Sequence, residues 1–448
     1  MELLDGTVIS TALPGIASSF HVGAIDAGLG VTAYLLTVAV MIPLSGWLSD
    51  RFGARPVFCV AIVLFTLASV LCAASQTLWQ FVLARVLQGV GGAMMVPVGR
   101  TVVLRGAAKA DLMAATAIIT WPGLIAPVLG PPIGGVITTY ASWRWIFLIN
   151  VPLGVIALVS ALLAVPASRR RRRRPFDGLG FALSAVSIAC LVYGLDQAGA
   201  GTNWLLTAGL LVIGLAVGVV AVRHALRHPT PLLDLSPLRI RTYAATSAEG
   251  SLLRLAINMV PFLLPLLFQV GFGLSAVTSG LLVLTVFAGN LVMKTITTPT
   301  VRRFGFRRVL VGNGVLVALS LAACALFGAS TPYWLISVVC FLGGAFRSLE
   351  FTGVNTLAFA DVPAESMSAA STLNATITQL ATGMGVAVAA TVVNVAAGGG
   401  VPTVSDFRVG FVVGAAIALV GALLFLRLDP TAGSVVSAGR PKSPAPHP

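Results

Sequence analysis

The chain has 448 residues, of which 57% are hydrophobic and only 9% are charged. Soluble domains contain about 45–50% apolar and about 25% charged residues, so the composition excludes a soluble enzyme, a disordered protein and a disulfide-stapled secreted domain. It predicts an all-α polytopic membrane protein, because a helix that crosses a bilayer needs about 20 mostly apolar residues. The net charge of +14 does not indicate nucleic-acid binding, because the basic residues gather between the apolar runs.

Fourteen apolar runs are predicted to span the membrane, and Gly, Pro and charged residues fill the gaps between them. In chain order, the predicted spans are 3–19, 29–48, 56–75, 79–104, 113–138, 145–165, 178–196, 204–222, 243–268, 277–298, 308–329, 333–354, 367–396 and 409–427. The first run is short, begins beside Glu2 and Asp5, and is interrupted by Pro14. We therefore expect the first span to be truncated at its N-terminus, with residues missing upstream of Met1.

Basic residues mark one side of the membrane. Of the 28 Lys and Arg residues, 21 lie in one set of alternate gaps and in the tail, whereas the opposite set holds only Arg144 and Arg408. The positive-inside rule places the first set, and with it both termini, in the cytoplasm. The run Arg169–Arg174 is interpreted as a topology anchor that touches anionic lipid.

An internal repeat divides the chain. Residues 51–55, Arg-Phe-Gly-Ala-Arg, recur as Arg-Phe-Gly-Phe-Arg at 303–307, and each copy follows the second span of a block of six. Two extra spans lie between the blocks, which is a six-two-six layout. The predicted domains are an N-terminal six-helix bundle (1–166), a linker with two extra transmembrane helices (167–242), a C-terminal six-helix bundle (243–427) and a disordered cytoplasmic tail rich in Pro, Ser, Ala and Gly (428–448).

Motifs along nearly the whole chain resemble one transporter family. Residues 46–55 resemble the loop signature of the major facilitator superfamily, and residues 4–14 resemble the first-span motif of its fourteen-span drug:proton antiporters, the EmrB/QacA type. Residues 85–89, 130–135 and 143–152 are similar to later motifs of that branch, and residues 289–294 and 346–350 are most like the MdtD/HsrA-like subgroup. The resemblance implies a major facilitator fold and a bacterial inner-membrane, proton-coupled exporter of small organic compounds (multidrug-type efflux) that works by alternating access.

The resemblance also implies two structural devices. A gating loop is expected to latch the two halves on the cytoplasmic side, although a plain positive-inside loop is the alternative; its residues are Gly46, Asp50, Arg51, Gly53 and Arg55. The second copy has Arg302 in place of the Asp and cannot act in the same way. The fifth span is expected to be a bent, tightly packed antiporter helix, with simple helix packing as the alternative; its residues are Gly130, Pro131, Gly134 and Gly135.

Ionisable residues inside the spans are costly and are therefore candidates for function. The resemblance assigns proton loading to Asp5, with Arg85 lining the same cavity, and a structural hydrogen bond at Asp5 is the alternative. The residues expected in proton coupling are Asp5, Arg85, Glu249 and Glu350. Arg347 and Glu350 are three residues apart, so they could instead form a self-neutralised pair on one helix face.

Further polar residues are expected to line a substrate cavity. They are Gln88, Arg254, Asn258, Asn290, Lys294, Arg347 and Asn355. Lys294 could alternatively extend to the cytoplasmic edge. The spans hold at least as many bases as acids, so we expect an anionic or zwitterionic substrate.

Other chemistries find no support in the sequence. No Lys follows a Gly, which excludes a GxxxxGK[ST] phosphate loop. The five Cys form no CxxC, and the four His are assigned to loops or the tail, so neither a catalytic nor a metal site is predicted. We expect no cofactor, a proton gradient as the energy source, and a monomer whose partners are a small organic substrate, protons and the lipid bilayer, without nucleic acid. A periplasmic adaptor protein, a uniporter or importer of a small metabolite, and a non-transport sensor or scaffold remain open alternatives.

Overall fold

The computed structural model describes residues 2–22, 24–106, 134, 136–138, 140–165, 175–200, 204–398, 400 and 402–434, and all regular elements within these ranges are helical. The helices are α1 (Glu2–Phe20), α2 (Ala24–Phe52), α3 (Ala54–Ala74), α4 (Leu78–Gly106), α6 (Arg144–Leu148), α7 (Asn150–Ala164), α8 (Gly178–Ala200), α9 (Trp204–Arg227), α10 (Arg241–Leu266), α11 (Ala276–Phe304), α12 (Phe306–Ala325), α13 (Tyr333–Ala360), α14 (Met367–Ala396) and α15 (Val404–Leu424). Shorter helical turns are η2 (Ser236–Arg239), η3 (Leu267–Gly271), η4 (Ala364–Ser366) and η5 (Phe425–Arg427).

Long apolar helices dominate the described part of the chain. Twelve of its helical segments are long and apolar enough to cross a membrane. The all-helical, polytopic prediction is therefore confirmed, whereas the count of fourteen spans is not. Helix α1 is not among the twelve, and the predicted span 113–138 lies mostly outside the described residues.

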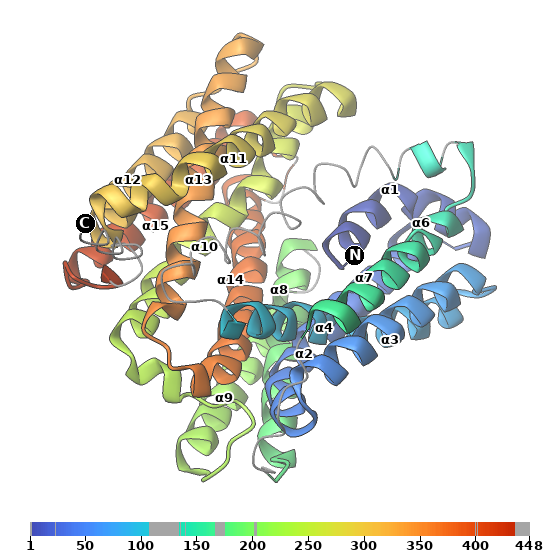
Figure 1. The fold of residues 1–448 in the computed structure, drawn as a ribbon. Helices are drawn as coiled ribbons and strands as arrows, with labels where there is room; N and C mark the ends of the chain where they lie inside the picture. The colour runs from blue at the N-terminus through green and yellow to red at the C-terminus, as the bar shows by residue number, and fades with distance from the viewer. Residues whose placement is uncertain are drawn as a thin grey trace, which may run out of the picture.

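The helices form two bundles: Figure 1 shows the N-terminal bundle (α1 to α7) on the right and the C-terminal bundle (α10 to α15) on the left. In the N-terminal bundle, α3 packs against α4 and α7, and α2 packs against α4. In the C-terminal bundle, α11 packs against α13, α12 against α15, and α10 against α14 and α15. Glycines allow the closest of these approaches: a Cβ on Gly344 of α13 would overlap the carbonyl oxygen of Val286 on α11.

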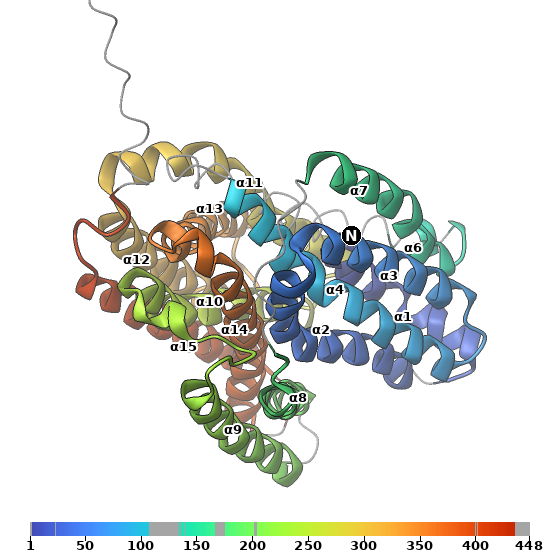
Figure 2. The ribbon, with the colours of Figure 1, turned by 60° about the horizontal axis from the view of Figure 1, so that its bottom comes forward.

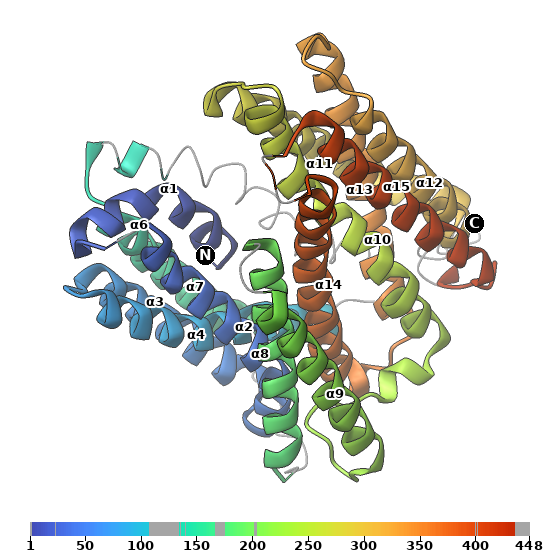
Figure 3. The same cartoon turned by 180° about the vertical axis from the view of Figure 1, so that it is seen from behind.

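Helices α8 and α9 are the extra pair between the bundles. They pack against each other, and α8 also contacts α2 of the first bundle and α14 of the second. Figures 2 and 3 show the pair on the outside of the molecule, beside both bundles. The extra helices therefore cover the seam between the two halves on one side.

The two bundles meet at the end of the molecule that carries Arg51, Arg55, Arg303 and Arg307, which we call the Arg-rich end. There the hydroxyl groups of Ser45 on α2 and Thr372 on α14 lie 3.3 Å apart. Ser368 of α14 donates a hydrogen bond of 3.4 Å to the carbonyl oxygen of Gly46 on α2. Contacts between α2 and α14 thus join the halves at this end.

The sequence repeat is also a structural repeat. Gly53 and Gly305 adopt positive φ angles of 92° and 76°, which a Cβ would oppose, and so allow the turns from α2 to α3 and from α11 to α12. Arg55 donates to the carbonyl oxygen of Leu162 at 2.6 Å, and Arg307 donates to that of Leu426 at 2.7 Å. Each Arg therefore caps the C-terminal end of the last helix of its own bundle.

Candidate functional site

A buried polar cluster lies in the core of the N-terminal bundle. It joins Asp5 of α1, Ser69 of α3, Arg85 and Gln88 of α4, and Asn150 at the start of α7. Arg85 and Gln88 are three residues apart on α4, so they present their side chains on one face of that helix. We call these five residues the Asp5 cluster.

The Asp5 carboxylate is held from three sides. Arg85 Nη1 donates to one of its oxygens at 2.6 Å, in an ion pair whose two side chains are both 0% exposed. Gln88 Nε2 and Asn150 Nδ2 donate to the other oxygen at 3.0 and 3.2 Å. Both amides also donate to Ser69 Oγ, so the cluster is one connected hydrogen-bond network.

The Arg85 guanidinium has several partners, but not all of its N–H groups are hydrogen-bonded to described residues. Its Nη1 also donates to Gln88 Oε1 at 2.5 Å, and its Nε donates to the carbonyl oxygen of Gly30 at 3.2 Å. The guanidinium carbon lies 4.1 Å from the centre of the Tyr34 ring, a cation–π contact. Arg85 Nη2 is buried and has no hydrogen-bond partner among the described residues. Removal of the Asp5 charge would therefore leave a buried cation with no anion to neutralise it.

A second buried cation lies in the C-terminal bundle. Arg254 of α10 donates through Nη2 to the amide oxygens of Asn355 on α13 and Asn374 on α14, at 3.2 and 3.3 Å. Its Nε and Nη1 have no hydrogen-bond partner within the described part of the chain. Arg254 is 2% exposed and forms no ion pair with a described acid. We call these three residues the Arg254 cluster, in which the guanidinium donates to neutral amide oxygens and meets no acid among the described residues.

The region around Arg254 adds more positive charge. Arg100 of α4, in the opposite bundle, is close enough to interact electrostatically with Arg254 and with Tyr243. The Arg100 guanidinium carbon also lies 5.8 Å from the centre of the Phe359 ring on α13. Asn258 lies one turn beyond Arg254 on α10, and its Nδ2 donates to the Arg254 carbonyl oxygen at 2.7 Å.

The other predicted residues of the second half do not join this cluster. Lys294 of α11 is 7% exposed, and its Nζ donates to Thr352 Oγ1 of α13 at 2.5 Å, so its ammonium group lies between these two helices. Asn290 is buried, and its Oδ1 has no partner among the described residues. Arg347 lines an apolar cavity bounded by α10, α11, α12 and α13.

The remaining predicted acids are separate from Asp5. Asn313 of α12 donates to Glu350 Oε2 at 2.8 Å, and Glu350 forms no ion pair with Arg347. The self-neutralised pair is therefore absent from the structure, because Glu350 takes a partner on a neighbouring helix. Glu249 is half-buried on α10, where Arg427 attracts it electrostatically. The structure thus groups Asp5 with Arg85 but leaves Glu249 and Glu350 elsewhere.

The predicted gating loop occupies the last turns of α2 and the start of α3. A Cβ on Gly46 would lie 2.5 Å from Thr372 Oγ1, so this glycine lets the two bundles approach. Asp50 lines a small cavity together with Thr372 and Leu232, and the Arg51 guanidinium lies 5.3 Å from the centre of the Trp47 ring. Of the predicted antiporter helix, Gly134 is helical and buried, whereas Gly130, Pro131 and Gly135 lie outside the described residues.

Several hydrogen-bond partners of the predicted residues were not themselves predicted as site residues. They are Ser69, Asn150, Asn374, Asn313 and Thr352. A polar side chain inside an apolar run was the only available signal. That signal does not reveal which residues meet, because the partners lie on different helices.

Comparisons with known proteins agree with this architecture. The sequence profile of the Major Facilitator Superfamily matches residues 1–386 and 250–447. Proteins that carry the name multidrug resistance protein MdtD, from Escherichia coli strain K12 and from Shigella boydii serotype 18, are each 42% identical over 393 residues. The matched region covers 87% of this chain and 83% of each relative.

Two solved structures share the fold at low sequence identity. The human organic anion transporter MFSD10 (TETRAN) has a TM-score of 0.66 at 16% identity, covering 95% of this chain and 96% of its own. The proton:xylose symporter XylE, bound to 6-bromo-6-deoxy-D-glucose, has a TM-score of 0.65 at 16% identity, covering 98% of this chain and 95% of its own. The resemblance seen in the sequence is confirmed: the chain belongs to the Major Facilitator Superfamily, in its MdtD-like subgroup, and is a multi-pass membrane transporter rather than an enzyme.

Proposed function

We propose that this chain is a proton-coupled antiporter that exports small organic compounds of multidrug type by alternating access. The observation that carries the proposal is the buried ion pair between Asp5 and Arg85, with 2.6 Å between Oδ2 and Nη1. A buried carboxylate that can gain and lose a proton is what proton coupling requires. The name of the MdtD relatives, which refers to multidrug resistance, supports export as the direction and drugs as the substrates.

In this proposal, protonation of Asp5 is the step that releases the N-terminal bundle. A proton on the carboxylate removes its charge, so Arg85 loses its anionic partner, and its Nη2 has no hydrogen-bond partner among the described residues. Breaking a buried ion pair in this way costs about 3–5 kcal/mol, because the remaining charge is uncompensated. That free energy favours an arrangement of the two bundles in which water or substrate reaches Arg85.

The substrate class follows from the Arg254 cluster. Arg254 is buried and has two nitrogen atoms without a partner among the described residues, and Arg100 adds a second positive charge nearby. A carboxylate or another anionic group would satisfy both the charge and the free donors. We therefore propose that the preferred substrates are anionic or zwitterionic.

The proposed setting is the bacterial cytoplasmic (inner) membrane. The chain would cross it fourteen times, through the twelve candidate spans, α1 and the predicted span 113–138. The Arg-rich end and both termini would face the cytoplasm, as the positive-inside rule requires. The chain would act as a monomer, and its transport step would draw energy from the proton gradient without a cofactor.

The test is proton movement in proteoliposomes that contain the purified full chain. A pH gradient is imposed, and a trapped pH-sensitive dye reports proton flux after addition of organic anions, zwitterions or cations. We expect anions and zwitterions to trigger flux, and we expect Asp5→Asn to abolish it. Asp429→Asn is the matched control, because Asp429 is exposed and lies outside the spans. Compound uptake without proton flux would instead indicate a uniporter or importer, and no response in folded protein would contradict proton coupling.

A further inference from the structure

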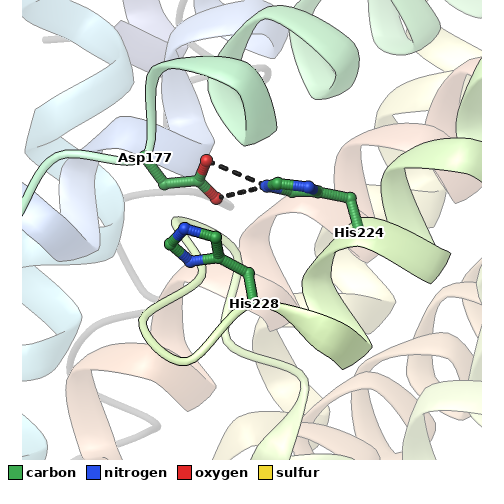
Figure 4. Close-up of side chains that lie close together, drawn as sticks. All are labelled: Asp177, His224 and His228. Carbon is green, nitrogen blue, oxygen red and sulfur yellow. Dashed lines mark hydrogen bonds and ion pairs between the residues drawn. The ribbon is translucent and has the colours of Figure 1, made fainter.

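A cluster of potential metal ligands lies outside the sites described above, at the Arg-rich end of α8 and α9. It consists of Asp177, which directly precedes α8, His224 in the last turn of α9, and His228, which directly follows α9. One ligand atom from each residue lies within 4.8 Å of those of the other two. Figure 4 shows the carboxylate and the two imidazole rings converging from the two helices.

The two histidines share one helix face. They are four residues apart, and the amide of His228 donates to the carbonyl oxygen of His224 at 2.8 Å, so the helical turn continues to His228. Their rings are 5.0 Å apart and inclined by 32°. Helix α9 extends to Arg227, so His224 is helical and not in a loop as the sequence suggested.

Asp177 is oriented before any cation arrives. Its side chain is 3% exposed, and its two oxygens accept hydrogen bonds from the amides of Gly180 at 2.8 Å and Leu232 at 3.2 Å. Burial alone would raise the pKa of this carboxyl group, but these two amides and the His224 ring lower its pKa below the ordinary value. The hydrogen bonds from Gly180 and Leu232 thus hold the carboxylate in one orientation, as the partners of metal-binding carboxylates commonly do.

We propose that Asp177, His224 and His228 form a binding site for a divalent transition-metal cation such as Zn²⁺. Two imidazoles and one carboxylate are a common zinc ligand set, in which a water takes the fourth position. His224 Nε2 now donates to both Asp177 oxygens, at 2.9 and 3.1 Å. For a cation to bind there, the ring takes its other neutral tautomer: the Nε2 proton passes to solvent, Nδ1 takes up a proton, and the freed Nε2 lone pair binds the metal.

His228 can join the site with the loss of a single hydrogen bond. Its Nδ1 accepts a hydrogen bond of 3.2 Å from the Thr230 amide, and coordination through either ring nitrogen breaks this one contact. The side chains of His224 and His228 are only partly buried, so a hydrated cation can reach them. The proposal concerns binding alone and does not depend on what the chain transports.

A cation at this site would hold α8 and α9 together beside the contact between α2 and α14 that joins the two bundles. Leu232, whose amide holds Asp177, lines the same small cavity as Gly46 and Thr372. Phe176, the neighbour of Asp177, lies 5.0 Å from the Trp47 ring of α2, measured between ring centres. The site is therefore placed to stiffen the contact between α8, α9 and the Arg-rich end of α2.

The test measures metal binding to the purified full chain in detergent, with any polyhistidine tag removed. Zn²⁺ binding is followed by competition with a chromophoric chelator, and Co²⁺ reports the coordination geometry through its visible absorption bands. We expect one equivalent of Zn²⁺ per chain and a four-coordinate Co²⁺ spectrum, with no competition from excess Mg²⁺, which prefers oxygen ligands. Each of His224→Ala, His228→Ala and Asp177→Asn should weaken binding at least about tenfold.

The controls separate site loss from unfolding. His21→Ala and His447→Ala remove the other two histidines of the chain and should leave binding unchanged. His228→Ala is the decisive variant, because this side chain is partly exposed and helps little to hold the fold. Thermal unfolding profiles identify variants that are folded. The proposal is overturned if folded wild-type chain binds no Zn²⁺, or if binding survives in folded His228→Ala or in the other two variants.

Discussion

Replacement of Asp5 by Asn should destabilise the protein more than replacement of Asp5 and Arg85 together. At an effective dielectric constant of about 20, opposite charges about 3 Å apart attract each other by roughly 5–6 kcal/mol. Desolvation of the two groups offsets most of this attraction, and both side chains are fully buried. Loss of one partner keeps the desolvation cost of the other, so Asp5→Asn or Arg85→Gln alone should cost about 3–5 kcal/mol.

The double variant removes both charges and should be more stable than either single variant, which requires a coupling energy larger than either single loss of about 3–5 kcal/mol. The four proteins are compared by thermal unfolding in detergent, and Asp429→Asn again serves as the exposed-acid control. We expect the unfolding midpoint of the double variant to lie above those of both single variants. A midpoint that drops by the sum of the single effects would refute the argument, because additive losses mean that the two charges do not neutralise each other in the folded protein.

Three further predictions concern other residues. Gly46→Val should slow substrate-driven proton flux strongly, because even a Cβ at this position would lie 2.5 Å from Thr372 Oγ1 and would hold the two bundles apart. Gly28→Ala is the control and should leave the flux unchanged, because a Cβ at Gly28 would meet open space. Arg254→Met should raise the thermal unfolding midpoint, because it removes a buried cation that has no acidic partner among the described residues, and should abolish flux with anionic compounds; a lowered midpoint would contradict this. Glu350→Gln should fold and lower the number of protons moved per substrate; an unchanged ratio would remove Glu350 from proton coupling.

The arrangement of the helices could largely be predicted from the sequence. Within the described residues, each apolar run between Gly-, Pro- and Arg-rich gaps is helical, because hydrogen bonds within a helix are the way to satisfy a backbone in lipid. The ends were predicted less well: α2, α11 and α13 extend past the predicted spans to Phe52, Phe304 and Ala360. The last turns of α2 and α11 contain charged residues, Asp50 and Arg51 in α2 and Arg302 and Arg303 in α11, so hydropathy alone does not mark where these two helices stop.

The candidate site could be predicted only in part. Asp5 and Arg85 stood out because a charge inside an apolar run is expensive. Asn150 and Ser69 did not, because a neutral polar residue inside a span costs much less and its partner is chosen by packing between helices. Arg347 and Glu350 show the opposite error: spacing on one helix suggested a pair, but Asn313 of α12 offers Glu350 a hydrogen bond of 2.8 Å.

The cluster of Asp177, His224 and His228 shows how much depends on contacts that are distant in the sequence. The spacing of two histidines four residues apart could be seen in the chain, but the predicted span ended at residue 222 and left both in a loop. The acid lies 47 residues before His224, at the start of the preceding helix. The antiparallel packing of α8 against α9 brings the start of one helix to the end of the other, and that packing alone assembles the cluster.

The internal repeat duplicates a fold without duplicating its chemistry. Both copies place a glycine at positive φ and an Arg on the end of the last helix of the bundle. The first copy has Asp50 and the small Gly46, which lets α2 touch α14 of the other bundle. At the same offset of 252 residues, the second copy has Arg302 and the larger Thr298. The turn occurs in both bundles because each needs it to connect two consecutive helices. The residues that make contact with the other bundle occur only in the first copy of the repeat. A transporter built in this way can use its two similar halves for different tasks, because the first holds the ion pair of Asp5 and Arg85 and the second holds Arg254, which has no acidic partner in the described part of the chain.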